Sequence, residues 1–259
     1  VLCASTLTLC ACGSNGRGTA ESTTNTTNTQ PIVDNSPLCD GNTLKILAIT
    51  SSFGLNTTQF LYDIAKAEGC TNVIVGRLYG SGCTLERHVD NAMNSNNYYE
   101  YTKNSTGKWE QINNIPMSYG LKDEDWDIIF IQQSADQSPD PNTYALAQTD
   151  YIDTLVDYVN KNKTNPNARF VWNLTWAFQN DCVRNTFEKY NNDQMTMYNA
   201  LISTLKEKVI VKDFYSAIIP TGTAIQNVRT SFIGDTLTKD TLHLNNLGRA
   251  IAGYTAYAT

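Results

Sequence analysis

LAITSSFGLN, residues 47–56, joins the end of an apolar run to two serines, a phenylalanine and a glycine. The apolar part belongs to Leu44–Ile49, which predicts a strand that is buried on both faces. Ser51 and Ser52 therefore stand at the carboxyl end of a strand, a position where hydrolases can hold a nucleophile. The alternative is a turn that only reverses the chain, and the rest of the sequence decides between the two.

Four further apolar runs are continuous rather than alternating, as expected for strands of a parallel sheet. With the first, the predicted strands are Leu44–Ile49, Val73–Tyr79, Asp127–Gln132, Arg169–Leu174 and Val209–Phe214. Helical patterns lie between and after them, over Thr57–Glu68, Tyr151–Asn160, Met195–Lys206 and Leu247–Tyr257. This alternation predicts a flavodoxin-like, three-layer α/β/α fold with a five-stranded parallel sheet and helices on both faces. The alternating segments Tyr98–Thr102 and Lys108–Ile112 predict a surface hairpin insertion.

Polar and small residues follow every predicted strand. Open α/β sheets bind ligands at the carboxyl ends of their strands, so these residues share one rim. They are Ser51-Ser52, Gly80–Cys83, Gln132–Ser134, Thr175-Trp176 and, beyond a long loop after the fifth strand, Asp240–His243. The rim is therefore the predicted functional site.

A serine hydroxyl needs a base that takes its proton, and only two histidines are present, His88 and His243. His243 stands just before the last predicted helix, and Asp240 is placed to fix the orientation of its ring. The plain alternative for this Asp-x-x-His segment is an ordinary surface turn. The chain has no GxSxG elbow, so the layout differs from that of α/β-hydrolases.

Composition excludes several classes of function. The chain has 259 residues, 41 % of them hydrophobic, which is enough for one sizeable domain. Its net charge of −6 argues against nucleic acid or an anionic membrane surface as a partner. Two histidines cannot form an all-histidine metal site, and HExxH, CxxC and Walker-type motifs are absent. The sequence therefore predicts neither a metal nor an organic cofactor.

The N-terminal region differs from the rest of the chain. Residues 1–12, VLCASTLTLCAC, are similar to the end of a signal peptide, and Leu9–Cys12 resembles a bacterial lipobox that would make Cys12 the lipidated residue. The alternative is a Cys-rich leader without lipid. Residues 13–36 are rich in Ser, Thr and Asn, which predicts a disordered linker before a domain over 37–259. The last helix runs into the chain end, as it would after a short C-terminal truncation. We therefore expect a secreted or cell-surface lipoprotein, held to the membrane only through its lipid.

Seven segments together carry a resemblance to a known family. They are KILAITSSF, LYGSGCTLERH, DWDIIFIQQSADQS, WNLTWAFQ, DQMTMY, IPTGTAIQNVRTSF and DTLHLNNLGR. From about residue 44 to 259 the chain resembles the SGNH, or GDSL-type, hydrolase superfamily. More closely it resembles a family of bacterial SGNH-like secreted proteins catalogued as a domain of unknown function.

The resemblance assigns roles to the rim residues. The family block Gly-Asn-Ser-Phe corresponds to Thr50–Phe53, which implies that Ser52 is the nucleophile and that Ser51 shapes the turn. The terminal Asp-x-x-His implies His243 as base and Asp240 as its partner. Because the β-branched Thr50 does not readily take a positive φ, the turn is expected to differ in geometry from that of the family.

The same resemblance implies an oxyanion hole. Its expected donors are the backbone N–H groups of Ser52 and Gly82 and a side-chain amide. The superfamily supplies an asparagine from a Gly-x-Asn-Asp block, whereas this chain has Gln132-Gln133-Ser134, and Gln133 is the expected donor. Each has a plain alternative, since Gly82 is also a turn glycine and Gln133 a helix cap.

Three further residues are candidates for contacts with substrate, namely Gln132, His88 and Trp176, although His88 and Trp176 also fit a core position. The resemblance and the secreted context imply a serine esterase that removes acyl groups, with acetyl expected, from carbohydrate or another small ester. The alternatives are a surface glycan-binding lipoprotein whose catalytic machinery has decayed, and a lipid or aryl esterase.

Overall fold

The structure is a computed structural model that describes residues 42–259. The predicted signal-peptide remnant, the lipidation site Cys12 and the linker over 13–36 lie outside the described residues. Within 42–259, no helix is both long and apolar enough to cross a membrane. Cys70 is disulfide-bonded, whereas Cys83 and Cys182 are buried free thiols.

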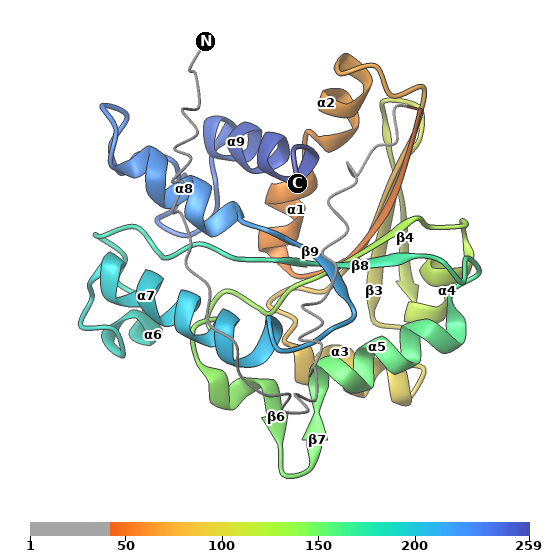
Figure 1. The fold of residues 1–259 in the computed structure, drawn as a ribbon, viewed down its shortest axis with the longest axis horizontal. Coiled ribbons are helices and arrows are strands. Elements are labelled where there is room, and N and C mark those ends of the chain that lie inside the picture. The colour runs from red at the N-terminus through yellow and green to blue at the C-terminus, as the bar shows by residue number, and fades with distance from the viewer. Residues whose placement is uncertain (1–41) are drawn as a thin grey trace, which may run out of the picture. The chain divides into compact units, whose positions relative to one another are not determined.

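Seven strands form the central sheet in the order β4-β3-β2-β1-β5-β8-β9 (Figure 1). Their bounds are β1 Thr43–Thr50, β2 Asn72–Tyr79, β3 Tyr99–Asn104, β4 Trp109–Ile115, β5 Ile128–Ile131, β8 Arg169–Asn173 and β9 Tyr215–Ile219. Strands β1, β2, β5, β8 and β9 are parallel, whereas β3 is antiparallel to both β2 and β4. A separate two-stranded hairpin consists of β6 (Ala145–Leu146) and β7 (Thr149–Asp150).

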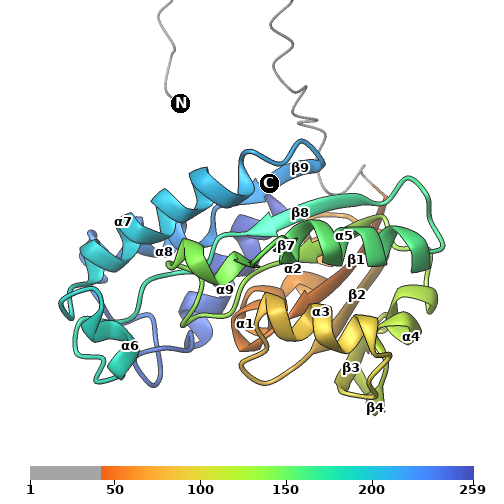
Figure 2. The same ribbon diagram turned by 90° about the horizontal axis from the view of Figure 1, so that it is seen from below.

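Helices cover both faces of this sheet. Their bounds are α1 Ser52–Thr58, α2 Leu61–Ala67, α3 Leu85–Met93, α4 Met117–Lys122, α5 Tyr151–Asn162, α6 Asn185–Glu188, α7 Gln194–Thr204, α8 Thr221–Arg229 and α9 Asn246–Tyr257. A 3-10 turn at Pro141–Tyr144 and a π-helical turn at Leu205–Val209 complete the elements. Helices α1, α2 and α8 each contact α9, whereas α3, α4 and α5 contact one another on the opposite side of the sheet (Figure 2).

The central strand β1 explains the layering. Ile46 and Ala48 pack in one core cluster with α2 and α9, whereas Leu47 and Ile49 pack in the other with α3, α4 and α5. Successive side chains of a strand point to opposite faces, so a strand between two helical layers needs apolar residues at every position. The predicted α/β fold with helices on both faces of the sheet is therefore confirmed, although the sheet is mostly parallel rather than wholly parallel.

Two details of the predicted sheet are wrong. The sheet has seven strands rather than five, because the segment read as a surface hairpin pairs with β2 and extends the sheet as β3 and β4. The fifth parallel strand is Tyr215–Ile219 and not Val209–Phe214. In the predicted segment Val209 closes a π-helical turn, while Ile210 and Val211 are exposed, so an apolar run alone did not identify a buried strand.

The register places the strand ends at one level. Thr50 of β1 pairs with Tyr79 of β2, and Ile49 pairs with Ile131 of β5. Ile131 pairs in turn with Trp172 of β8. The segments that follow these strands consequently leave the sheet side by side, as the sequence predicts for the functional rim.

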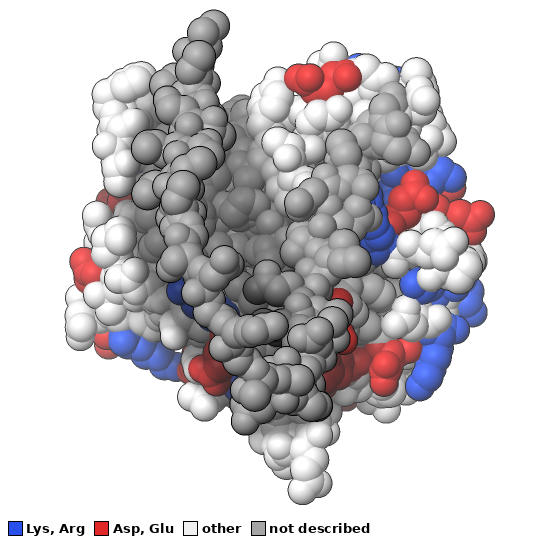
Figure 3. Space-filling view, in the orientation of Figure 1, with Lys and Arg blue, Asp and Glu red and all other residues white. Residues whose placement is uncertain are grey.

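Charged side chains are mixed on the surface. On the face shown in Figure 3, basic and acidic residues lie beside one another. Among the described residues, several charged side chains form ion pairs, including Lys103 with Asp123 at 2.7 Å and Lys212 with Asp150 at 2.7 Å. This mixture gives the described part of that face no continuous basic surface.

Candidate active site

Ser52 is the first residue of helix α1, immediately after β1 and the N-cap residue Ser51. Ser51 has extended backbone with φ of −103°, and neither it nor Thr50 has a positive φ. The Thr50-Ser51 departure from the family block therefore requires no left-handed residue. A Cβ atom at Gly54 would overlap Thr50 Oγ1, so glycine at 54 accommodates the threonine.

His243 lies opposite Ser52 on the loop before helix α9. Its Nε2 is 2.9 Å from Ser52 Oγ, and its Nδ1 is 2.8 Å from Asp240 Oδ2. The hydrogen-bond network assigns the proton on Nδ1, which donates to the carboxylate and leaves Nε2 to accept from the serine. The structure thus brings together the three residues that the sequence analysis named as nucleophile, base and orienting acid.

The Asp240 carboxylate is held by its own turn. Its Oδ1 accepts from the backbone N–H groups of His243 at 2.6 Å and of Leu242 at 3.2 Å. Desolvation raises the pKa of Asp240, but the hydrogen bonds from the backbone and ring of His243 and from Leu242 together outweigh it. The pKa consequently lies below its ordinary value, which keeps the carboxyl ionised beside the imidazole.

Gly82 lies in the loop that follows β2. The loop starts beside the serine turn, because the N–H of Gly80 donates to the carbonyl of Thr50 at 3.1 Å. Gly82 has φ of +56°, a left-handed conformation that favours glycine, and a Cβ atom there would meet nothing within 4 Å. Backbone conformation, and not a lack of space, therefore explains the glycine.

The two glutamines after β5 are structural supports. The Gln133 carboxamide makes four hydrogen bonds, accepting from the N–H groups of Leu85 and Ser134 and donating to both oxygens of Thr143. Because the Gln133 amide nitrogen already donates to Thr143, this arrangement does not fit the expected role of Gln133 as a donor to the oxyanion. Gln132 accepts from Asn173 and donates to Ser51 Oγ at 3.3 Å.

None of the three candidate substrate contacts is exposed. Gln132 is 1 % exposed, and His88 and Trp176 are each 0 % exposed. The expectation that they line the pocket is therefore wrong. All three are polar or aromatic residue types that occur both at binding surfaces and in protein interiors, so the residue type alone did not show that they are buried.

His88 is a buried, neutral histidine of helix α3. Its Nδ1 is 2.9 Å from the Tyr99 hydroxyl, and its Nε2 has no partner among the described residues. Burial lowers the pKa of His88 to about 3. In the unfolded chain the pKa of this histidine is about 6.5. Between about pH 6.5 and 3 the unfolded chain therefore binds a proton on His88 and the folded chain does not, so protonation favours unfolding.

This interval gives a measurable pH dependence. As the pH falls from about 6.5 towards 3, we expect His88 to lower the free energy of unfolding by up to about 1.4 kcal/mol per pH unit. Urea unfolding of the wild type and of His88→Gln at several pH values measures the difference in slope. Equal slopes for the two proteins would show that the histidine is not buried in its neutral form.

Asn56 is a residue of this site that the sequence analysis missed. It lies one turn after Ser52 on α1, is buried, and its Oδ1 accepts from the backbone N–H of Leu244 at 2.6 Å. In the sequence it is a polar residue beside a predicted helix, and nothing there indicates a partner 188 residues away.

Among the described residues, no group of three or more His, Cys, Asp or Glu side chains is arranged to hold a metal ion.

The site thus belongs to an α/β protein with a mostly parallel sheet covered on both faces, a serine after the central strand and an Asp-x-x-His turn facing that serine. The model of the family described as "Domain of unknown function (DUF4886)" matches residues 45–259, and the chain belongs to that family. The predicted resemblance to a family catalogued as a domain of unknown function is thereby confirmed.

Solved structures include a member of the same family. A DUF4886 family protein from Bacteroides uniformis is 33 % identical, with a TM-score of 0.77 over 83 % of this chain and 82 % of that chain. A putative GDSL-like lipase from Parabacteroides merdae is 10 % identical, with a TM-score of 0.48 over 83 % and 94 %. A family 3 carbohydrate esterase from Clostridium thermocellum is 12 % identical, with a TM-score of 0.45 over 83 % and 94 %. Similarities as weak as the last two do not bear on the reaction. A search of curated proteins finds no match.

Proposed function

We propose that this chain is a serine esterase in which Ser52 is the nucleophile, His243 the general base and Asp240 the residue that orients His243. The observation that carries the proposal is the continuous hydrogen-bonded chain from Ser52 Oγ through His243 to Asp240, with distances of 2.9 and 2.8 Å. Three polar side chains in this order are what an alcohol needs to become a nucleophile at neutral pH.

The reaction has two steps. Ser52 Oγ attacks the ester carbonyl while His243 Nε2 takes the hydroxyl proton, and an oxyanion forms. The carbon–oxygen bond to the alcohol then breaks, His243 returns the proton to the departing alcohol, and an acyl-serine remains. Water attacks this acyl group with His243 again as base, which releases the acid and restores Ser52.

The proposed oxyanion donors are the backbone N–H groups of Ser52 and Gly82. The first N–H groups of a helix have no acceptor within that helix, and Ser52 is the first residue of α1. Gly82 belongs to the neighbouring loop, and its left-handed backbone sets the direction of its N–H. Gln133 is left out of this proposal because its amide contacts Thr143.

The proposed substrates are acyl esters of carbohydrate, with acetyl as the acyl group. This choice rests on the resemblance in the sequence motifs. It is supported by the openness of the site, because the His243 and Asp240 side chains are 28 % and 46 % exposed. An ester carried on a bulky, hydrated alcohol suits an open site better than a long acyl chain, which needs an apolar trough.

Covalent labelling tests this proposal directly. The full chain is treated with a fluorophosphonate, and the labelled peptide is identified by mass spectrometry beside acetate release from acetylated xylo-oligosaccharides. We expect label on Ser52 that disappears in Ser52→Ala and persists in Ser51→Ala. A folded protein that neither takes the label nor releases acetate would contradict the proposal and favour the glycan-binding alternative, which a glycan array would then measure.

A further inference from the structure

The two residues that flank His243 are both held by side chains linked to the nucleophile helix. The backbone N–H of Leu244 donates to Asn56 Oδ1 at 2.6 Å. The backbone carbonyl of Leu242 accepts from the Trp176 indole N–H at 2.9 Å. His243 is therefore fixed on both sides along the chain.

Asn56 gives the first of these attachments. It lies four residues after Ser52 on α1, so the two side chains share one face of the helix. Ser52 contacts His243 and Asn56 contacts the next residue, Leu244, so the two contacts lie one above the other. A rotation of the histidine loop away from α1 would break both together.

Trp176 gives the second attachment. Its ring stacks on the ring of Phe53 with 3.9 Å between centroids and 6° between planes. Phe53 follows the nucleophile in sequence, and Leu242 precedes the base. A single buried side chain thus contacts a neighbour of Ser52 through its ring face and a neighbour of His243 through its N–H.

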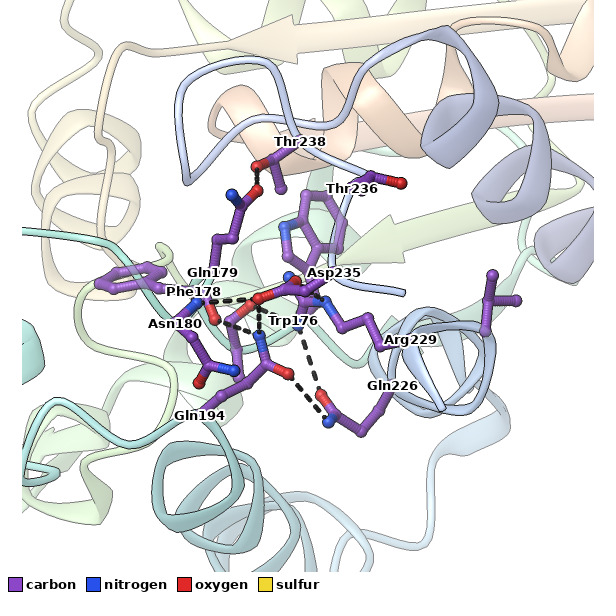
Figure 4. Close-up of polar contacts among 12 residues, drawn as sticks. Trp176, Phe178, Gln179, Asn180, Gln194, Gln226, Arg229, Asp235, Thr236 and Thr238 are labelled. Carbon is purple, nitrogen blue, oxygen red and sulfur yellow. Dashed lines mark hydrogen bonds and ion pairs between the residues drawn. The ribbon is translucent and has the colours of Figure 1, made fainter. Parts of the chain in front are cut away.

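The segment that follows Trp176 strengthens this connection. The N–H of Gln179 donates to the Thr241 carbonyl at 2.9 Å, and its side chain accepts from the Thr238 hydroxyl (Figure 4). Thr241 has φ of +65°, which for a β-branched residue costs about 1–3 kcal/mol and persists only where surrounding contacts hold it. The strained turn between Asp240 and His243 is consequently kept in place by residues 176–180.

Asp235 anchors the beginning of the same loop. Its Oδ2 accepts from the N–H of Asn180 at 2.9 Å and from Gln194 Nε2 at 3.1 Å (Figure 4). Its Oδ1 is 2.9 Å from Nε of the buried Arg229, a close ion pair whose N–H is not aligned as a hydrogen bond. Three elements of the fold, α7, α8 and the segment after β8, therefore meet at the start of the loop.

We propose that Asn56 and Trp176 are positioning residues that set the separation of Ser52 and His243, and that neither contacts the substrate. This inference rests on the proposed esterase function. A displacement of about 1 Å in reacting groups can reduce a rate by about 100-fold, so two attachments beside the base have a large effect on turnover. Substrate binding does not involve them, because both side chains are buried.

The test compares Trp176→Phe and Asn56→Leu with the wild type in the full chain. Phenylalanine keeps an aromatic ring against Phe53 but lacks the indole N–H. Leucine keeps the branched shape of Asn56, with a somewhat larger side chain, but lacks the acceptor. For each we expect kcat to fall about 10- to 100-fold with KM changed less than about 2-fold. The rate of fluorophosphonate labelling of Ser52 should fall by the same factor. Asn56→Asp, which retains the acceptor, should recover most of kcat on the plateau of its pH–rate profile.

Trp126→Phe is the matched control. Trp126 is as buried as Trp176 and donates its indole N–H to the Gly120 carbonyl at 2.7 Å. It precedes β5 and so lies at the opposite edge of the sheet from the rim. This variant loses a hydrogen bond of the same kind, and we expect kcat and the labelling rate to stay within about 2-fold of the wild type.

The outcomes separate the two proposals. A wild type that neither turns over esters nor takes the label overturns the esterase function and this inference with it. An active wild type whose Trp176→Phe and Asn56→Leu variants match it in kcat overturns the positioning role alone. An equal loss in Trp126→Phe also overturns it, because general destabilisation would then explain the data. If either main variant does not fold, the milder Asn56→Ser decides, with a fall in kcat of at least about 5-fold expected at unchanged KM.

Discussion

Replacement of Ser52 by alanine is expected to lower kcat/KM for acetyl esters by about 10⁴-fold or more. The variant retains the backbone N–H of residue 52 and the His243–Asp240 pair, but it has no oxygen that can form an acyl-enzyme. Losses of this size are typical when the nucleophile of a triad is removed. Steady-state kinetics with an acetylated oligosaccharide and with a chromogenic acetate ester measure the effect.

Ser51→Ala is the control for this experiment. Ser51 Oγ accepts from Gln132 Nε2 at 3.3 Å, so alanine leaves a buried amide without that acceptor, at a cost of about 1–3 kcal/mol in the free energy of unfolding. Its kcat/KM should remain within about 10-fold of the wild type, because Oγ of residue 51 takes no part in the reaction. A large loss in Ser51→Ala with little loss in Ser52→Ala would reverse the assignment of the two serines.

Asp240→Asn is expected to lower kcat by about 10²- to 10⁴-fold while the protein stays folded. The asparagine oxygen can still accept from the backbone N–H groups of Leu242 and His243, so the turn is retained. Its amide nitrogen cannot accept the proton on His243 Nδ1, so the tautomer that leaves Nε2 free to accept is no longer favoured. Because Asp240 is half exposed, water can accept from His243 Nδ1 in part of the molecules, and the smaller expected loss in kcat, about 10²-fold, corresponds to this case.

Two measurements check the interpretation of Asp240→Asn. The midpoint of thermal unfolding should match the wild type within a few degrees, whereas Asp240→Ala should unfold earlier because its turn loses both backbone hydrogen bonds. Ring nitrogen NMR shifts of His243 should show a larger fraction of the Nε2–H tautomer in Asp240→Asn. An unchanged tautomer together with unchanged kcat would remove Asp240 from the mechanism.

The sequence predicted the features that depend on local pattern. Continuous apolar runs located β1, β2, β5 and β8, because strands between two helical layers have no solvent-facing side. The Asp-x-x-His spacing also determined a local geometry, since Asp240 binds backbone and ring atoms only two and three residues away. The meeting of Ser52 with His243 followed from both lying at the carboxyl edge of one sheet.

Contacts between distant loops were beyond sequence reasoning. Gln133, His88 and Trp176 are residue types that serve both binding surfaces and cores, and only the packed structure shows that all three are buried. The fifth strand was misplaced because Ile210 and Val211, though apolar, lie exposed in a turn. The partners of Asn56 and Trp176 are backbone atoms, which carry no signal in the sequence.

The site also has a consequence for the order of folding. Ser52 and His243 are 191 residues apart, Asn56 and Leu244 are 188 apart, and Trp176 and Leu242 are 66 apart. Contacts of such long sequence separation form late, because closing a long loop costs entropy before any contact offsets it. On the proposed function, a growing chain therefore carries its serine long before its base arrives, and ester hydrolysis would begin only when the loop that holds His243 has met helix α1. Esterase activity, if the proposal holds, would then report that these distant segments have come together.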